Sequence, residues 1–367
     1  LNSHGYFFTP AFSPVLLNIG FILGAVLFRK YFNEPLYGLA LGVMAGGLMQ
    51  VVLQVPSMIR AGFRMKFSID LKHPGIRKIF RLIAPATFGI AVYQINILMN
   101  TILASLLPSG SISYLFYSDR LTEIVLGVFI VSIGNVILPE MSRVSAMDDI
   151  DRLKKIFRTS VNAALFLAIP ASAALMIIGY PILSVLFMRG EFTSFHTEMT
   201  QRALFFSSAG ICSIALLRIT TPTYYSLKDT RTPVITSTIA FVVNITFGYI
   251  LMKTFLLHAG LALANTLAVT VQVSILVIVL RKKIGSLHIR EYIVPVSKII
   301  AASLGMGIVL HYISGYADWT GGSFSSRLIT LIVMVTTGGA VYFAICMALK
   351  VEELTYVVEK LKRKVGR

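Results

Sequence analysis

Three charged residues stand inside a segment of the chain that is otherwise apolar: Asp119, Arg120 and Glu123. A charge at the centre of a membrane helix costs about 2.5–3.5 kcal/mol on translocon-based scales, so charges that persist there mark candidate functional sites. A guanidinium is always charged and can bind two phosphate oxygens at once. This pattern favours the binding of an anion by Arg120. The two carboxylates would either orient the guanidinium or exchange places with the anion as its partner.

The helical spacing extends this group into a polar stripe. Ser113, Tyr117, Arg120 and Glu123 recur at intervals of three and four residues, so they share one side of a helix and should face an aqueous cavity instead of lipid. The alternative is a structural ion pair between Arg120 and Glu123 that holds two helices together, which leaves Asp119 unexplained.

Two further groups of charges are weaker candidates. Arg218 lies about eight residues from the end of another apolar segment, where it either lines a cavity or extends to the membrane surface. Lys228, Asp229 and Arg231 form a tight turn before a proline. That turn is either a solvated connection or a cytoplasmic gate.

Motifs of several enzyme classes are missing from the sequence. It contains no P-loop, no Gly-x-Ser-x-Gly, no His-Glu-x-x-His and no cluster of cysteine and histidine. We therefore expect no enzymatic activity, no metal site and no cofactor. An ion gradient or the membrane potential would have to supply the energy for any transport. A monovalent cation that couples to transport would have to bind to side-chain amides, such as those of Asn96, Asn100, Asn244 and Asn265.

The composition requires a membrane. Of the 367 residues, 56% are hydrophobic and only 13% are charged, whereas soluble domains average about 25% charged residues. The apolar runs are long and continuous, which predicts an all-α polytopic membrane protein and excludes a β-barrel. The net charge of +17 comes mainly from short loops between these runs, so we expect no nucleic-acid partner.

Ten apolar segments are long enough to cross the membrane, and Pro170 is expected to kink the fifth. Of the 33 basic residues, 25 fall in loops on one side and 6 on the other, which makes the first side cytoplasmic and places the C-terminus there. The ten segments are 9–28, 36–59, 82–107, 112–138, 159–187, 203–226, 233–252, 257–280, 293–313 and 328–349.

A short repeat relates the first two segments to the seventh and eighth. Gly38-Leu39-Ala40-Leu41 precedes Gln50, and Gly260-Leu261-Ala262-Leu263 precedes Gln272, with a Gly-to-Gln spacing of 12 in both. An offset of six helices predicts a parallel repeat of six-helix lobes, of which the first is incomplete. We expect the chain to be the C-terminal portion of a longer protein. The predicted divisions are the end of one lobe, a complete lobe, two extra helices, and a basic amphipathic tail: 1–66, 67–284, 285–350 and 351–367.

Several motifs resemble those of the MurJ/MviN lipid II flippases, in the multidrug/oligosaccharidyl-lipid/polysaccharide exporter superfamily. The resemblance spans residues 7 to 233, and the hydropathy continues the family pattern to the end. The motifs are Phe7–Pro14, Tyr117–Leu121, Gly127–Phe129, Ile137–Arg143, Arg189–Thr193 and Tyr224–Pro233.

The resemblance implies a fold of fourteen helices, of which this chain would carry helices five to fourteen. It implies transport of lipid-linked peptidoglycan precursor across the bacterial cytoplasmic membrane by alternating access, for cell wall synthesis. Arg120 matches a cavity arginine of the family, with Asp119 beside it, and the two extra helices would hold the polyprenyl tail. Because other cavity arginines lie on earlier helices, we do not expect these 367 residues alone to transport.

Three other functions remain open. An exporter of another polyprenyl-linked glycan or of drugs would share the architecture, although a drug–cation exporter would favour an acidic cavity. A non-transporting scaffold would recruit cell-wall enzymes, and its polar stripe would be structural. A membrane-embedded glycosyltransferase would need a catalytic carboxylate near a loop. The expected partners are the lipid-linked precursor, membrane lipids and, as a further candidate, cell-wall synthesis proteins.

Overall fold

The computed structural model describes residues 8–28, 31–32, 34–62, 91–92, 94–287 and 290–354. These residues form helices joined by short turns, and no strand occurs among them. The chain divides into two compact units, residues 1–81 and residues 82–367. The predicted boundary at residues 66 and 67 lies outside the described residues, as does the tail from residue 355 onward.

The first unit contains a helical hairpin, α1 (Phe8–Leu27) and α2 (Pro35–Arg60), which begins its second helix at a proline that has no N–H to lose. Glycines bring the two backbones into contact: a Cβ added at Gly20 would lie 2.5 Å from the carbonyl oxygen of Gly42. Close approach through small residues is how membrane helices associate when the surrounding lipid is as apolar as their side chains. Gln54 Nε2 also donates to Ser13 Oγ at 3.0 Å.

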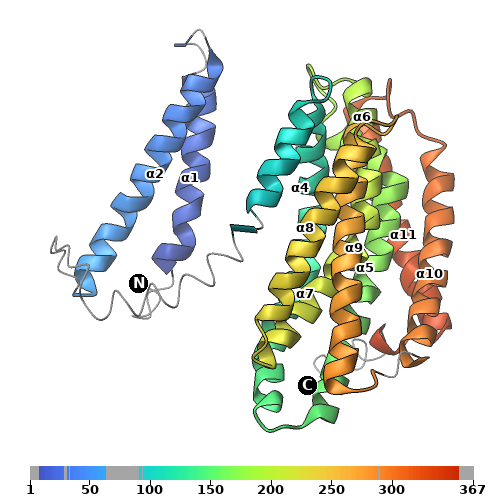
Figure 1. Ribbon diagram of the computed structural model, residues 1–367. Coiled ribbons are helices and arrows are strands. Elements are labelled where there is room, and N and C mark those ends of the chain that lie inside the picture. Colours follow the sequence, from blue (N-terminus) through green and yellow to red (C-terminus); the bar gives the residue numbers. More distant parts are fainter. Residues whose placement is uncertain are drawn as a thin grey trace, which may run out of the picture. The chain divides into compact units, whose positions relative to one another are not determined.

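The second unit is a bundle of helices that begins with a helical stretch over residues 94–105 (Figure 1). The helices that follow are α4 (Ser111–Ser145), α5 (Ile150–Leu186), α6 (Ser194–Ala209), α7 (Ile211–Ser226), α8 (Arg231–Leu251), α9 (His258–Ile284), α10 (Arg290–Ser314) and α11 (Phe324–Ala348).

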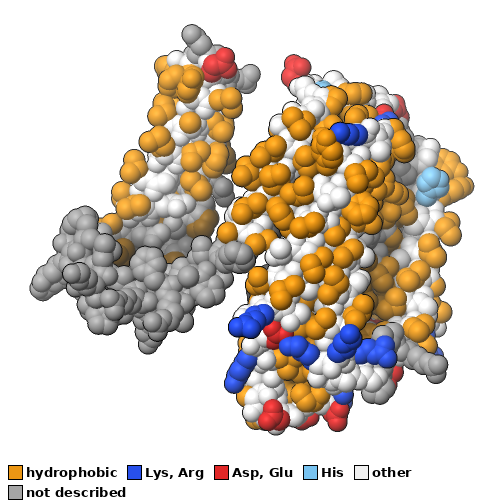
Figure 2. Space-filling model, viewed as in Figure 1, with side chains coloured by type: hydrophobic (Ala, Val, Ile, Leu, Met, Phe, Trp, Pro, Cys, Tyr) orange, Lys and Arg blue, Asp and Glu red, His pale blue; other side chains and the backbone are white. Residues whose placement is uncertain are grey.

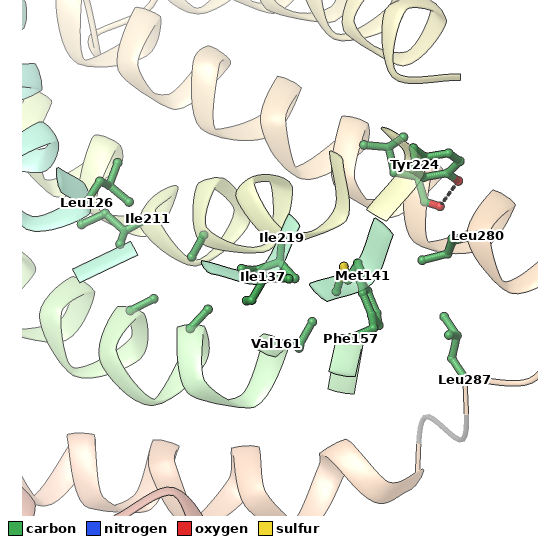
Figure 3. Close-up of a cluster of buried hydrophobic side chains, with 14 of the residues drawn as sticks. Leu126, Ile137, Met141, Phe157, Val161, Ile211, Ile219, Tyr224, Leu280 and Leu287 are labelled. Atoms are coloured by element: carbon green, nitrogen blue, oxygen red, sulfur yellow. Dashed lines mark hydrogen bonds between the residues drawn. The ribbon is translucent and has the colours of Figure 1, made fainter. Parts of the chain in front are cut away.

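Apolar side chains from α4, α5, α7 and α9 form the main core of this bundle. Figure 3 shows Ile137 and Met141 of α4 beside Phe157 and Val161 of α5. Tyr224 of α7 is fully buried, and its hydroxyl donates to the carbonyl oxygen of Leu276 at 2.6 Å. Burial of this polar group therefore comes with a hydrogen bond, as it must away from water.

A second core joins α10 and α11 to the other side of α5. It includes Phe166 of α5, Met306 of α10 and Met334 of α11. The hydroxyl of Tyr342 on α11 donates to the carbonyl oxygen of Phe166 at 2.7 Å. The last two helices are thus attached to the bundle through α5.

Seven described helices are long and apolar enough to cross a membrane, and α6 with α7 makes an eighth if a bent pair counts as one span. This confirms an all-helical membrane protein, while the count of ten and the six-helix repeat stay predictions. The predicted sixth segment, 203–226, covers the end of α6 and all of α7, and the chain bends by 41° between these two helices.

The backbone hydrogen bonds at Gly210 depart from the helical pattern. In a continuous helix the N–H of Gly210 would donate to the carbonyl of Phe206, but it donates to Ser207 at 3.0 Å instead. The Phe206 carbonyl accepts from the Thr266 hydroxyl at 2.8 Å, and the Ser172 hydroxyl donates to the carbonyl of Ser208 at 2.7 Å. Side chains of neighbouring helices thus satisfy the carbonyls that the break releases.

Two helices extend beyond the predicted segments. The predicted segments leave a loop at 139–158, but α4 continues to Ser145 and α5 begins at Ile150, so only residues 146–149 form a turn. Asp149 in this turn accepts from the backbone N–H of Arg152 at 3.0 Å. The break in α5 lies at Ile178 (φ −105°, ψ 18°), not at Pro170. Pro181 follows three residues later and removes a helical donor, which explains the position of the break.

Candidate functional site

The predicted site lies on α4, whose first turn is fixed by a glycine. Gly110 has φ +95°, and a Cβ at this position would lie 2.6 Å from the hydroxyl oxygen of Tyr114. Both the left-handed backbone and the contact exclude a side chain. Helix α4 begins at the next residue, so Arg120 lies about 14 Å along it.

The structure brings Arg120 and Glu123 together. Nη1 of Arg120 donates to Oε2 of Glu123 at 2.6 Å, and the two side chains are 57% and 55% exposed. The guanidinium carbon lies 4.9 Å from the centre of the Phe116 ring, within cation–π distance. This pair joins two turns of one helix and therefore fixes no second helix in place.

The other members of the predicted stripe have different surroundings. Ser113 and Asp119 are exposed, and no described residue forms an ion pair with Asp119. Tyr117 is half-buried, with its ring 4.7 Å from that of Phe187 and 5.4 Å from that of Phe192. Three charges and one hydroxyl thus share an accessible side of α4, while Tyr117 belongs to an aromatic cluster at one end of the bundle.

Arg218 lies in the middle of α7, eight residues after the break at Gly210. Its side chain is exposed, and no ion pair with it occurs among the described residues. The geometry is compatible with either interpretation of this residue, a cavity lining or extension to the membrane surface.

The turn between α7 and α8 is organised around Asp229. Its carboxylate accepts from the backbone N–H groups of Arg231 and Thr232, both at 3.0 Å, from the Thr232 hydroxyl at 2.6 Å, and from Lys283 at the end of α9. Burial alone would raise the pKa of Asp229, but the bonds from Lys283 and Thr232 outweigh it and lower the pKa to about 2. Lys228 and Arg231 are exposed.

Two polar clusters join residues that are distant in the sequence. In the first, Nδ2 of Asn244 on α8 donates to Oδ1 of Asn96 at 2.8 Å and to Oδ1 of Asn100 at 2.9 Å. These three amides are thus brought together as one group, of which Asn265 is not a member.

The second cluster was not predicted. The Tyr114 hydroxyl and His196 Nδ1 share a hydrogen bond of 2.7 Å, and the Tyr114 ring lies 5.1 Å from that of His258. No group of three or more potential metal ligands of the His, Cys, Asp or Glu type occurs in the described part of the chain.

These features define a multi-spanning, all-helical membrane protein that keeps a cation and two carboxylates exposed on an apolar helix. Comparison with known proteins narrows this class. The family model for lipid II flippase MurJ matches residues 1–331, so the chain belongs to the MurJ lipid II flippase family. The resemblance found in the motifs is therefore confirmed.

Relatives and a solved structure agree. The probable lipid II flippase MurJ of Vibrio cholerae is 38% identical over 353 residues, which cover 96% of this chain and 67% of that protein. The corresponding protein of Haemophilus influenzae is 35% identical, with 96% of this chain and 70% of that protein covered. A structure titled lipid II flippase MurJ, inward closed conformation, matches all of this chain and 70% of its own with a TM-score of 0.75 at 25% identity.

Proposed function

We propose that this protein moves lipid II from the inner to the outer leaflet of the bacterial cytoplasmic membrane by alternating access, with Arg120 binding the diphosphate. The observation that carries the site assignment is the exposed Arg120–Glu123 pair, which lies about 14 Å from the start of α4. Two exposed charges at that depth would be costly against lipid, so a water-filled cavity is the environment that suits them.

The ion pair allows Arg120 to exchange Glu123 for a diphosphate as its binding partner. In the empty site, Glu123 accepts a hydrogen bond from Arg120 and keeps the guanidinium oriented. A diphosphate offers more charge and more acceptor oxygens than one carboxylate, so it can displace Glu123 and bind the guanidinium with two hydrogen bonds. Release on the other side restores the pair, and Asp119 beside it adds repulsion that limits how tightly the anion is held.

The orientation follows from the distribution of basic residues. Lys and Arg gather at the end of the larger unit where α7 meets α8 and where α9 ends (Figure 2). The positive-inside rule makes this end cytoplasmic. The C-terminus, which follows α11, then also lies in the cytoplasm.

The lipid tail would lie along the last two helices. Helices α10 and α11 contact the bundle through α5 and carry large exposed apolar side chains. Leu304 of α10 is 64% exposed, and Ile300, Ile308 and Ile332 are exposed as well. We infer that this surface accommodates the polyprenyl chain while the head group crosses the membrane.

The proposal also covers the energy source of transport and the binding partners of the protein. A monovalent cation or the membrane potential would supply the energy, and the amide cluster of Asn96, Asn100 and Asn244 offers oxygen atoms within the bundle. Lipid II and membrane lipids would be the primary partners, with cell-wall synthesis proteins as further ones. The two carboxylates serve binding in this mechanism and not catalysis.

The test is a depletion experiment with the full-length protein in its host. Lipid II accessible from outside the cytoplasmic membrane is measured in cells rescued by wild type or by Arg120→Ala. We expect external lipid II to collapse on depletion and to return only with wild type. A rise of another polyprenyl-linked glycan, with external lipid II unchanged, would identify a different substrate. If neither pool changes, a scaffold role would replace transport.

A further inference from the structure

A cavity of about 470 Å³ lies between the end of α4 and the beginning of α5, away from Arg120. Arg152 and Lys155 of α5 and Glu140 of α4 line it, together with Thr159 and Ser160 of α5. Its volume falls in the range of sites that bind small molecules or head groups. The function proposed above makes no use of these residues.

The charges of this cavity are available to a ligand. Neighbouring ion pairs join Lys154 to Asp151 and Arg158 to Glu291, but none of the described residues pairs with Arg152, Lys155 or Glu140. The side chains of all three are exposed. The cavity therefore offers two free cations and one free carboxylate.

The two hydroxyl groups can only accept. Thr159 donates its hydrogen to the carbonyl of Lys155 at 3.0 Å, and Ser160 donates its hydrogen to the carbonyl of Ile156 at 2.7 Å. Their oxygen lone pairs remain free for a donor. With Glu140, they form a set of acceptors beside the two cations.

Apolar side chains form the rest of the cavity wall. Ile137, Ile156 and Ala163 line it, and Ile137 also belongs to the buried core in Figure 3. From Arg152 to Ala163 the helix rises about 16 Å, so the lining changes from charged to apolar over about half the thickness of a bilayer core.

We propose that this cavity binds phosphatidylethanolamine of the cytoplasmic leaflet. Arg152 and Lys155 bind its phosphate, while Glu140, Thr159 and Ser160 accept hydrogen bonds from its ammonium group. The acyl chains follow Ile137, Ile156 and Ala163. The assignment of the leaflet rests on the proposed orientation, but the binding itself does not depend on transport.

Charge complementarity separates this lipid from its competitors. Phosphatidylglycerol has the phosphate but no cation for Glu140, and phosphatidylcholine has a cation without N–H donors. Each basic residue near a membrane surface contributes about 1 kcal/mol to anion attraction, or roughly fivefold in affinity. Loss of both cations should therefore weaken binding of either phosphate head group by roughly thirtyfold.

The experiment uses the full-length protein in phosphatidylcholine nanodiscs that contain a small fraction of photoreactive phosphatidylethanolamine. Cross-linked peptides are identified by mass spectrometry, and unlabelled lipids compete. We expect cross-links between residues 137 and 163 that phosphatidylethanolamine suppresses better than phosphatidylglycerol. Arg152→Gln with Lys155→Gln should remove them, whereas Arg281→Gln with Lys282→Gln, exposed cations outside the cavity, should not.

Glu140→Gln is the decisive variant, because it should weaken the binding of phosphatidylethanolamine and strengthen the binding of phosphatidylglycerol. Asp151→Asn, which changes the net charge equally outside the cavity, should leave the preference unchanged. An equal loss of cross-links in the control variant, Arg281→Gln with Lys282→Gln, would show that basic residues attract the lipid without a specific site, and would overturn the proposal. A preference for phosphatidylglycerol in wild type would also overturn it. So would a finding that soluble phosphoethanolamine or farnesyl diphosphate displaces the photoreactive lipid better than unlabelled phosphatidylethanolamine does.

Discussion

At the scale of single residues, Arg120 is the group on which transport should depend most directly. Its exposed guanidinium is paired with Glu123, which in the proposed function orients it for an anion that offers two oxygens. Lysine keeps the charge but provides no planar fork. Arg120→Lys should therefore lower the rate of lipid II transport at least about tenfold, as measured by lipid II accessible from outside.

The chain contains a matched control for this substitution. Arg202 and Glu198 on α6 form an exposed pair with a separation of 2.7 Å, similar to that of Arg120 and Glu123. Arg202→Lys should leave transport close to wild type. Equal activity of both variants would contradict bidentate recognition of the diphosphate.

Asp229 should stabilise the folded protein. Its pKa of about 2 lies below the unfolded value near 3.9, so its contribution is present above about pH 4 and is lost as the pH falls through about 2. Asp229→Asn should cost about 1–2 kcal/mol at neutral pH, a value reduced from the full shift because Lys283 is 42% exposed and solvent screens the pair.

The measurement for Asp229 is the thermal unfolding midpoint in detergent at several pH values. The difference between wild type and Asp229→Asn should be largest near neutral pH and should shrink between about pH 4 and about pH 2. A constant difference across this range would show that the ion pair and hydrogen bonds are not its source.

At the scale of elements, the α1–α2 hairpin depends on the absence of side chains. A Cβ at Gly42 would lie 2.7 Å from Cα of Gly24, and a backbone atom cannot rotate away. Gly42→Ala should push the helices apart and destabilise the hairpin by about 1–3 kcal/mol. At Gly47 a Cβ meets nothing within 4 Å, so Gly47→Ala should be neutral.

Limited proteolysis of the protein in detergent can compare these two glycine variants. Cleavage within residues 28–34, between the helices, should accelerate for Gly42→Ala and stay unchanged for Gly47→Ala. Similar rates for both variants would show that the close approach does not hold the hairpin together.

Hydropathy predicts helices where the sequence itself marks their limits. The seventh to tenth predicted segments agree closely with α8 to α11 because polar turns bound each apolar run. It fails at Gly210, because the break depends on a hydrogen bond from Thr266, which lies 56 residues further along the chain. It also measures only the apolar part of a helix, so it predicts a loop where the polar ends of α4 and α5 lie.

The same limit applies to the site. Arg120 and Glu123 could be found because both the charges and their spacing lie within one helix. The contact of Tyr114 with His196 and His258 joins three helices, and no local pattern signals it. Sequence reasoning therefore finds sites built on one element more readily than sites built by packing.

At the scale of the whole molecule, the predicted orientation can be tested by labelling. Met147, in the α4–α5 turn, is 66% exposed, and Tyr316, after α10, is 73% exposed. With Cys212 and Cys346 replaced, Met147→Cys should react with a membrane-impermeant maleimide only after the cells are opened. Tyr316→Cys should react in intact cells whose outer membrane is permeable. The reverse pattern would invert the topology.

The length of α5 has a mechanical consequence. Its 37 residues extend about 55 Å, well beyond a hydrocarbon core about 30 Å thick, and the α4–α5 turn reaches past the neighbouring helix ends in Figure 1. The two helices form a lever arm. For any rotation of this bundle about a pivot within the bilayer, the turn moves through a longer arc than the groups on the membrane-embedded helices. A distance probe at Met147 would therefore amplify rocking motions that are small at Arg120.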